Sequence, residues 1–420
     1  MSTALEIGVV RLPQALGQRI DIAPTLDSIR QQVLDAGDRI DRDRRLPREL
    51  VDTLWEAGVF STVAPREVGG LELHPADYLD LIFELARLNG TVSWISIFQK
   101  GSLPLLPSPV MLELIEQAEG RLLFASSHSA VGRADRVSGG YRVSGSFPFA
   151  SGLPWSTHVT VWVDVFSEDG EPEIDLETGA QRRIDAVVRF DEVEYFDNWD
   201  VLGLRGSGSG GFEVHDVFVP ERMTTDGVPP EEYADRPFLS TPNAAEMGAM
   251  VLGCAHGAID RYLARGEKPG RKADPSIDEL RRIRLADAET TIRAARDLLW
   301  RGALITSQAE AGDENLVIAA SFNDPASDAQ SDDYMIALAE ELAANSYAVR
   351  VAKDAVNTIF EIAGTAAIRV DVGIERCLRD VYTASHHAGN AYRNLSMRGD
   401  YLMTKDNPNG PVIAVPPPLS

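Results

Sequence analysis

The chain has 420 residues, of which 44% are hydrophobic, so it is long enough to bury a large core in two or three domains. Its 64 Asp and Glu residues outnumber its 40 Lys and Arg residues, and the formal net charge of −24 disfavours nucleic acid and anionic membrane surfaces as partners. The two cysteines lack the spacing of a disulfide framework or a metal site, and no segment reads as a secretory signal or a membrane span, so a cytoplasmic protein without a metal is expected.

Residues 1–120 are predicted to form a helical domain. Segments such as "PTLDSIRQQVLDAGDRI" and "PADYLDLIFELARLNG" place apolar residues at helical spacing. From residue 121 to residue 236 the period changes to two, as in "HVTVWVDV" and "GFEVHDVFVPE", with Gly, Asp and Pro between the runs. This middle third is therefore predicted to be a β domain.

Residues 237–420 return to the helical period, and two of their runs reach about thirty residues, the length of bundle helices. Between these runs, the polar segment Asn323–Asp332 is predicted to be a mobile loop, and the chain ends in a proline-rich tail. The expected fold class is α+β with three domains: an N-terminal helical domain, a central β-barrel or sandwich, and a C-terminal four-helix bundle. Alanine-rich faces in the bundle favour packing against a partner subunit.

One segment of the β domain, "GLRGSGSGGFEVHDVFVPE" at residues 203–221, joins a glycine-rich turn to a regular strand. Glycine permits positive φ and close backbone approach, so the first half predicts a tight bend before the strand. Arg205 offers a charged, planar group within the bend. Two roles stay open for Arg205, an ion pair with a nearby Asp and a contact with a bound cofactor or substrate.

The layout and four motifs resemble the acyl-CoA dehydrogenase superfamily over nearly the whole chain. The motifs are "APREVGGLELHPADYLDLIFELARLNGTVSW", "GGYRVSGSFPFASG", the glycine-rich segment above and "CLRDVYTASHHAGNAYRN". This resemblance implies a flavin between the β domain and the bundle. It also implies an active enzyme. A scaffold or regulatory protein that kept the fold and lost the catalytic activity is a further hypothesis.

The base that the superfamily uses to remove an α-proton from an acyl thioester is missing from its usual place. Arg379 and Asp380 are present, but the eighth residue after Asp380 is Ala388, and no Asp or Glu occurs between Val381 and Gly399. Some members carry the base on the first bundle helix, close to Glu246 of this chain. An acyl-CoA dehydrogenase that uses Glu246 is therefore the alternative function.

A histidine pair, His386 and His387, stands beside the vacated position, and histidine suits proton transfer near neutral pH. This feature resembles the two-component monooxygenase branch of the superfamily. The branch takes reduced flavin from a separate reductase, reacts it with O2 to a C4a-hydroperoxyflavin, and inserts one oxygen atom into a small organic substrate. Aromatic or polyketide-like compounds and amino sugars are the substrates that the resemblance implies.

Other site residues follow from the same resemblance. His128, with Ser126 and Ser127, falls where dehydrogenases carry a carboxylate near the flavin, and His128 is a catalytic candidate beside His386 and His387. Ser151 matches the hydroxyl that hydrogen-bonds near flavin N5, and Gly152 permits close approach of the backbone to the ring.

The remaining candidates concern the rest of the cofactor. Trp155 could stack against the isoalloxazine or belong to the core, while Arg205, Arg271, Arg379 and Asp380 are candidate cofactor contacts. Because the phosphate-binding motif after the first bundle helix is altered to "RGEKPGRK", FAD and FMN both stay open. The resemblance further implies a homotetramer.

Overall fold

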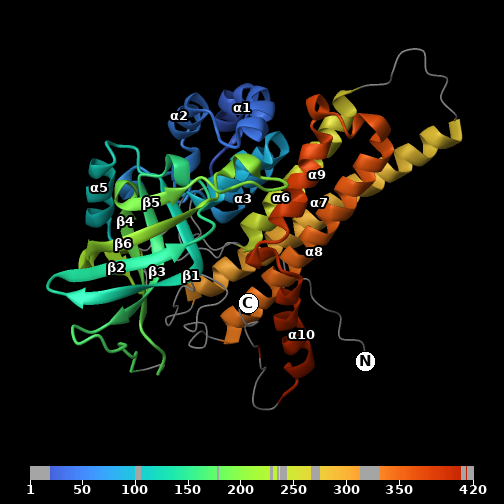
Figure 1. Cartoon of the computed structure of the whole chain (residues 1–420). Helices are drawn as coiled ribbons and strands as arrows, with labels where there is room; N and C mark the ends of the chain where they lie inside the picture. The colour runs from blue at the N-terminus through green and yellow to red at the C-terminus, as the bar shows by residue number, and fades with distance from the viewer. Residues whose placement is uncertain are drawn as a thin grey trace.

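The computed structural model describes residues 19–99, 106–176, 179–227, 230–233, 236, 244–265, 275–312, 332–407 and 413. The first helices of the chain, drawn in blue, lie above and between a sheet on one side and the long helices, drawn in orange, on the other (Figure 1). The predicted loop Asn323–Asp332 lies outside the described residues except for Asp332, where a helix begins, and the proline-rich tail lies outside them after residue 407 except for residue 413.

Five helices are described before the first strand: α1 (Ala23–Asp43), α2 (Arg48–Glu56), α3 (Pro75–Leu88), α4 (Gly90–Phe98) and α5 (Ser108–Gln117). Helix α4 follows α3 directly because Asn89 caps it, with its side-chain oxygen accepting hydrogen bonds from the backbone N–H groups of Thr91 and Val92. All residues of α4 from Gly90 to Ile97 are buried. The cap therefore fixes the start of a buried helix whose side chains reach the site described below.

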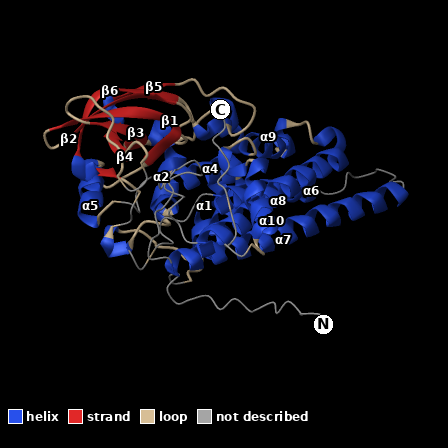
Figure 2. Ribbon diagram, turned by 90° about the horizontal axis from the view of Figure 1, so that it is seen from below, coloured by secondary structure: helices blue, strands red, loops and turns tan. Residues whose placement is uncertain are grey.

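The middle of the chain forms one mixed seven-stranded sheet in the order β5-β6-β2-β1-β3-β4-β7. The strands are β1 (Phe124–Val137), β2 (Gly140–Phe147), β3 (His158–Phe166), β4 (Arg183–Arg189), β5 (Val193–Phe196), β6 (Gly211–Pro220) and β7 (Thr224–Thr225). Only the β1–β3 pair is parallel among the described strands, and β1 is irregular between Ser127 and Gly132. Figure 2 shows this sheet beside the helices, not enclosed by them.

The C-terminal part consists of α6 (Ala244–Ala264), α7 (Pro275–Gly312), α8 (Asp332–Ala363), α9 (Ile374–Ala384) and α10 (Leu395–Thr404). Alanines such as Ala339, Ala344 and Ala348 are buried in the packing of α8 against its neighbours, as the alanine-rich pattern indicates. The predicted fold class is confirmed as the succession of helical domain, central sheet and helical bundle. The limits at residues 120 and 236 stay predictions.

The bundle buries two carboxylates close to each other. Glu246 is 2% exposed and accepts a hydrogen bond from the Tyr78 hydroxyl at 3.3 Å. Glu341 is fully buried and accepts a hydrogen bond from the backbone N–H of Ala245 at 3.2 Å. Burial raises the pKa of Glu341 to about 7, the N–H of Ala245 opposes this rise, and the nearby Glu246 adds to it.

This buried acid predicts an unusual dependence of stability on pH. Because the folded state holds the proton on Glu341 more tightly than the unfolded chain does, the free energy of unfolding should fall as pH rises from 5 to 8. The contribution is on the order of 3 kcal/mol. Glu341→Gln keeps the shape without the titration, so the difference between the urea unfolding curves of variant and parent should change across this range. A constant difference between pH 5 and pH 8 would contradict the assignment.

Candidate active site

The glycine-rich turn before β6 is held against α9 by backbone hydrogen bonds. The backbone N–H of Leu204 donates to the Asp380 carboxylate at 2.6 Å, and that of Gly203 donates to the Thr383 hydroxyl at 2.8 Å. Asp380 is 3% exposed, and burial raises its pKa to about 6 although the N–H of Leu204 lowers it. The predicted contact of Asp380 with a cofactor stays a prediction, but its structural role is to join the turn to α9.

Two arginines strengthen this joint by binding the end of α1. The Arg379 guanidinium donates to both carboxylate oxygens of Asp41 at 3.0 Å and to Glu375 at 2.6 Å. Arg205 donates to the backbone carbonyls of Asp41 at 3.2 Å and Val201 at 2.9 Å. Both side chains thus have protein partners, and their predicted cofactor contacts stay predictions.

Two glycines explain why the turn needs this composition. A Cβ on Gly203 would stand 2.2 Å from the carbonyl oxygen of Arg379, so only glycine allows the turn to approach α9 so closely. Gly208 has φ +57°, and a Cβ there would meet the Pro154 ring at 2.7 Å. The turn is therefore a tightly packed bend wedged between α9 and the loop after β2.

Within this bend, the hydroxyls of three buried serines form a chain. Ser151, after β2, lies with its Oγ 2.8 Å from Oγ of Ser209, which lies 2.7 Å from Oγ of Ser207. The Trp94 indole N–H of α4 donates to Ser151 Oγ at 3.0 Å. Trp94 and Ser151 are each 5% exposed, Ser209 is 3% exposed and Ser207 is fully buried. A helix, a loop and the glycine-rich turn thus meet at one hydroxyl.

His387, just after the end of α9, packs against Trp94. Its ring centroid is 5.6 Å from those of Trp94 and Phe98. Desolvation lowers the pKa of His387 to about 4, so the imidazole is neutral at pH 7. Its Nδ1 accepts a hydrogen bond from the backbone N–H of Gly389 at 3.2 Å, which places the proton of the neutral ring on Nε2. His387 therefore presents a hydrogen-bond donor to its surroundings.

A second polar group lies beside Ser151. The Gln99 side chain donates to the backbone carbonyl of Gly152 at 3.3 Å, and a Cβ on Gly152 would collide with Gln99 Nε2 at 1.9 Å. The Oε1 of Gln99 is buried and has no hydrogen-bond partner among the described residues. Trp155 packs against the large helical core and approaches Gly208, which is consistent with the core role that the sequence left open.

The other predicted site residues are placed elsewhere. His386 is exposed, with Nδ1 at 2.8 Å from the carbonyl of Tyr382. His128 Nε2 lies 3.0 Å from the Asp185 carboxylate, and its ring stacks on Trp162 of β3 at 4.8 Å. We call the buried side chains around Ser151 the Ser151 group; they are Ser151, Ser207, Ser209, Trp94, Phe98 and Gln99. Neither His386 nor His128 makes a contact with this group in the described part of the chain, so their catalytic roles stay predictions without support from this geometry.

The two serines beside His128 have local partners on β3 and on the loop after β2. Ser126 accepts a hydrogen bond from Thr160, and Ser127 donates to the carbonyl of Pro148. Arg271 lies outside the described residues. Arg265, the first residue of the same "RGEKPGRK" segment, donates to the carbonyl of Ala363 at 3.3 Å.

Comparison with known proteins identifies the family. The acyl-CoA dehydrogenase N-terminal domain matches residues 25–106, and the acyl-CoA dehydrogenase C-terminal domain matches residues 245–392. The chain belongs to the acyl-CoA dehydrogenase superfamily. The two matches cover most of both helical parts, and the central sheet lies between them in the order that the resemblance implies.

The relatives of this acyl-CoA dehydrogenase family member include monooxygenases. Indole-3-acetate monooxygenase of Pseudomonas putida is 26% identical over 83% of this chain and 85% of its own length. The flavin-dependent monooxygenase oxygenase subunit HsaA of Mycobacterium tuberculosis is 25% identical over 88% of this chain and 91% of its own length.

Solved structures share the fold. The 3-HSA hydroxylase of Rhodococcus sp. RHA1 superimposes with a TM-score of 0.75 at 21% identity, covering 94% of this chain and 99% of its own. XiaF from Streptomyces, in complex with FADH2 and glycerol, gives 0.74 at 20% identity, covering 94% and 96%. KijD3, in complex with FMN and an amino-deoxy sugar nucleotide, gives 0.68 at 19% identity, covering 93% and 95%.

The Ser151 group fits the isoalloxazine ring of a flavin. In oxidised flavin that ring is flat and neutral, and in both redox states its edge carries hydrogen-bond donors and acceptors. The residues here are the aromatic Trp94 and Phe98, the Ser151 hydroxyl and the unpartnered Oε1 of Gln99, with a neutral His387 beside them. Such residues can hold the ring, whereas those that would hold the phosphates of FAD or FMN are not defined by this geometry.

The sequence pointed to Ser151, Gly152 and His387, which stay predictions, but it did not point to their neighbours in the structure, namely Trp94, Phe98, Gln99, Ser207 and Ser209. Ser207 and Ser209 stand in the glycine-rich segment, where the sequence predicts only a tight bend. Trp94 ends one of the motifs that carry the resemblance. The Trp94 indole can only donate a hydrogen bond, and its closeness to the Ser151 hydroxyl becomes visible only through the packing of α4.

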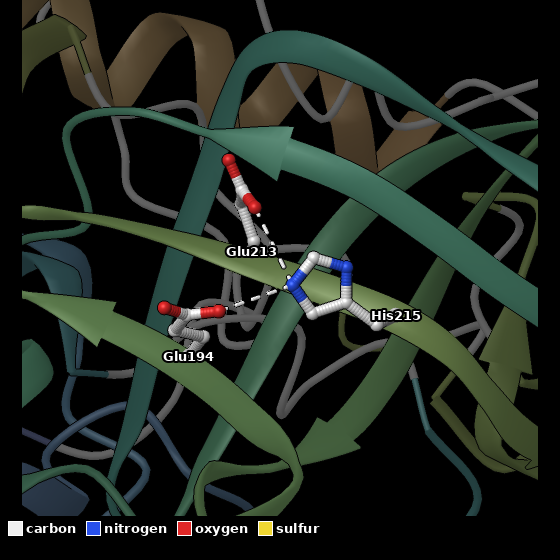
Figure 3. A group of neighbouring side chains, drawn as sticks. All are labelled: Glu194, Glu213 and His215. Carbon is white, nitrogen blue, oxygen red and sulfur yellow. Dashed lines mark hydrogen bonds and ion pairs between the residues drawn. The ribbon is translucent and has the colours of Figure 1, made fainter.

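One cluster of metal-ligand residue types lies away from this site, on the exposed surface of the sheet. Glu194 of β5 pairs with Glu213 of β6, and His215 Nε2 lies 3.3 Å from Glu194 and 3.4 Å from Glu213 (Figure 3). The His215 imidazole lies within 3.4 Å of both carboxylates, and these contacts account for the arrangement on the exposed surface, so we assign no ion to it.

The protonation of His387 can be tested directly. Spectra of protein labelled with 15N-histidine should show His387 neutral, with its proton on Nε2, from pH 8 down to pH 5, because desolvation holds its pKa near 4. The loss of one resonance in His387→Gln assigns the signal. A positively charged His387 at pH 6 would contradict this assignment.

Proposed function

We propose that this protein is the oxygenase component of a two-component flavin-dependent monooxygenase. Its relatives include enzymes named as monooxygenases over more than four fifths of the chain. The observation that supports the proposal is that a neutral histidine, His387, packs against Trp94, which donates to Ser151, while Ala388 stands at the position where many dehydrogenases carry their base. The bound reduced flavin supplies the electrons that activate O2, with one oxygen atom going to the substrate and the other to water.

The residues of the chain have distinct roles in this proposal. Ser151 offers its hydroxyl to the flavin edge near N5. The rings of Trp94 and Phe98 exclude water from the reacting face, which favours retention of the activated oxygen. His387 donates a hydrogen bond through Nε2 to the oxygen that accumulates charge or to the substrate. A base role for His387 is less favoured, because Nδ1 already accepts the N–H of Gly389.

We further propose that the substrate is a small aromatic compound. The names of the curated relatives include indole-3-acetate, and the aromatic rings of Trp94 and Phe98 could stack with such a molecule. An amino sugar is the second candidate, supported by the fold shared with KijD3, whose structure contains an amino-deoxy sugar nucleotide. FAD and FMN each occur in a structure of this fold, so the choice between them is part of the test below.

The partners follow from the same proposal. A separate flavin reductase is expected, since one relative is named as an oxygenase subunit. A homotetramer is proposed, and it is supported by apolar side chains that α7 leaves exposed, namely Ile277, Leu280 and Ile283. In the described residues, none of the helices is both long and apolar enough to span a membrane. Both cysteines are free and buried, which suits the reducing cytoplasm where we place the protein.

The decisive experiment separates the oxygenase from the alternative acyl-CoA dehydrogenase. The protein is mixed with chemically reduced FAD or FMN and oxygenated buffer, with indole-3-acetate as the probe substrate and 18O2 as the oxygen source. An oxygenase should delay the release of H2O2 relative to free reduced flavin and should label any product with one 18O atom. Anaerobic bleaching of the bound oxidised flavin by an acyl-CoA would instead support Glu246 as a base and overturn the proposal.

The role of His387 predicts a specific defect. His387→Ala should lower the yield of oxygenated product on the order of 100-fold, since it removes a hydrogen-bond donor at the reacting centre. The affinity for reduced flavin should change by less than about threefold, because the substitution leaves the Ser151 group in place. His215→Ala, on the exposed sheet surface, is the matched control and should behave like the parent. Unchanged turnover in His387→Ala would remove His387 from the mechanism.

A further inference from the structure

The hydroxyl chain from Ser207 to Ser151 has three protons and only two internal hydrogen bonds. One proton is therefore left over, and the directions of the two bonds decide whether Ser207, Ser209 or Ser151 carries it. If the bonds run from Ser151 to Ser207, the surplus proton sits on Ser207, which is fully buried and contacts no other acceptor side chain among the described residues. If they run from Ser207 to Ser151, the surplus proton sits on Ser151. If both end serines donate to Ser209, the surplus proton sits on Ser209, which is also buried. An unsatisfied buried donor is costly, and a flavin at Ser151 offers an acceptor only to the proton on Ser151, so flavin binding favours the direction from Ser207 to Ser151.

Trp94 acts on the same oxygen. The indole N–H can only donate, so it occupies one lone pair of Ser151 Oγ, and Ser209 occupies the other in the favoured direction. A hydroxyl that accepts two hydrogen bonds has a fixed rotamer and is a stronger donor through its own proton. Ser151 is thereby left with one committed function, which is to donate.

The geometry points to Trp94 and Ser209 as positioning residues that fix the Ser151 hydroxyl as a hydrogen-bond donor toward the N5 edge of the flavin. This inference rests on the proposed function, because it needs a flavin at the Ser151 group. It assigns a role to the glycine-rich turn beyond tight bending, since the turn delivers Ser207 and Ser209 to Ser151. The turn is tied to the Ser151 loop by backbone hydrogen bonds from Gly152 to Ser207 and from Ala150 to Gly210, at 2.9 and 3.0 Å.

The redox state of the flavin gives a direct readout. N5 of oxidised flavin is a hydrogen-bond acceptor, whereas N5 of reduced flavin carries a hydrogen. Trp94→Phe and Ser209→Ala should therefore each weaken the binding of oxidised flavin roughly fivefold, while the binding of reduced flavin changes less. Anaerobic titrations with oxidised and reduced FAD and FMN measure both affinities without turnover.

Double-mutant cycles with Ser151→Ala test whether the two residues act through Ser151. Once the Ser151 hydroxyl is gone, Trp94→Phe and Ser209→Ala should have no further effect on the affinity for oxidised flavin. In Ser151→Ala, the Trp94 indole N–H resonance of 15N-tryptophan-labelled, flavin-free protein should shift, because this N–H loses its acceptor. Ser209→Thr keeps the hydroxyl and should restore the parental affinity.

The matched control is Ser156→Ala. Ser156 is buried in the same loop, but its hydroxyl donates to the carbonyl of Gly152 and stands outside the chain. Equal effects of Trp94→Phe or Ser209→Ala in the parent and in Ser151→Ala would overturn the inference, as would an unchanged affinity for oxidised flavin. If the parental protein binds no flavin in either redox state, the proposed function itself fails, so the two failures are distinguishable.

Discussion

The hydrogen bond from the backbone N–H of Leu204 to the buried carboxylate of Asp380 is the contact on which the site depends. It fixes the glycine-rich turn against the last turns of α9, which ends at Ala384, three residues before His387. The turn delivers Ser207 and Ser209 on one side, and α9 delivers His387 on the other. A displacement of this joint would therefore separate the hydroxyl chain from the imidazole, although neither contains a residue of the joint itself.

The chemistry at this position is that of neutral donors. Ser151 is left with a proton to give, and His387 carries its proton on the nitrogen that does not face Gly389. Two buried carboxylates, Glu246 and Glu341, lie in the bundle with partners of their own, and the buried carboxylate of Asp380 accepts the backbone N–H of Leu204. A site that donates hydrogen bonds without removing protons suits the stabilisation of reduced oxygen more than the abstraction of an α-proton.

The periodicity of the sequence was enough to predict the three-part fold, because the change from helical to alternating pattern is strong and local. The candidate site was predictable only in part. Ser151 and His387 stand in motifs that the resemblance covers, whereas the bond from Trp94 to Ser151 joins residues 57 positions apart and follows from packing alone. The sequence favours His387 over His386 only by its position next to Ala388, whereas the different surroundings of the two rings depend on α9 ending at Ala384. Arg205 and Arg379 could likewise be recognised within their motifs. Their common partner, Asp41 in α1, could not be predicted from the sequence.

The bond between Arg379 and Asp41 joins residues 338 positions apart, so the beginning and the end of the chain must both be present before the joint can close. During synthesis, a nascent chain whose α9 has not yet emerged from the ribosome lacks both His387 and Asp380, which holds the glycine-rich turn. Such an unfinished chain has no assembled place for a reduced cofactor.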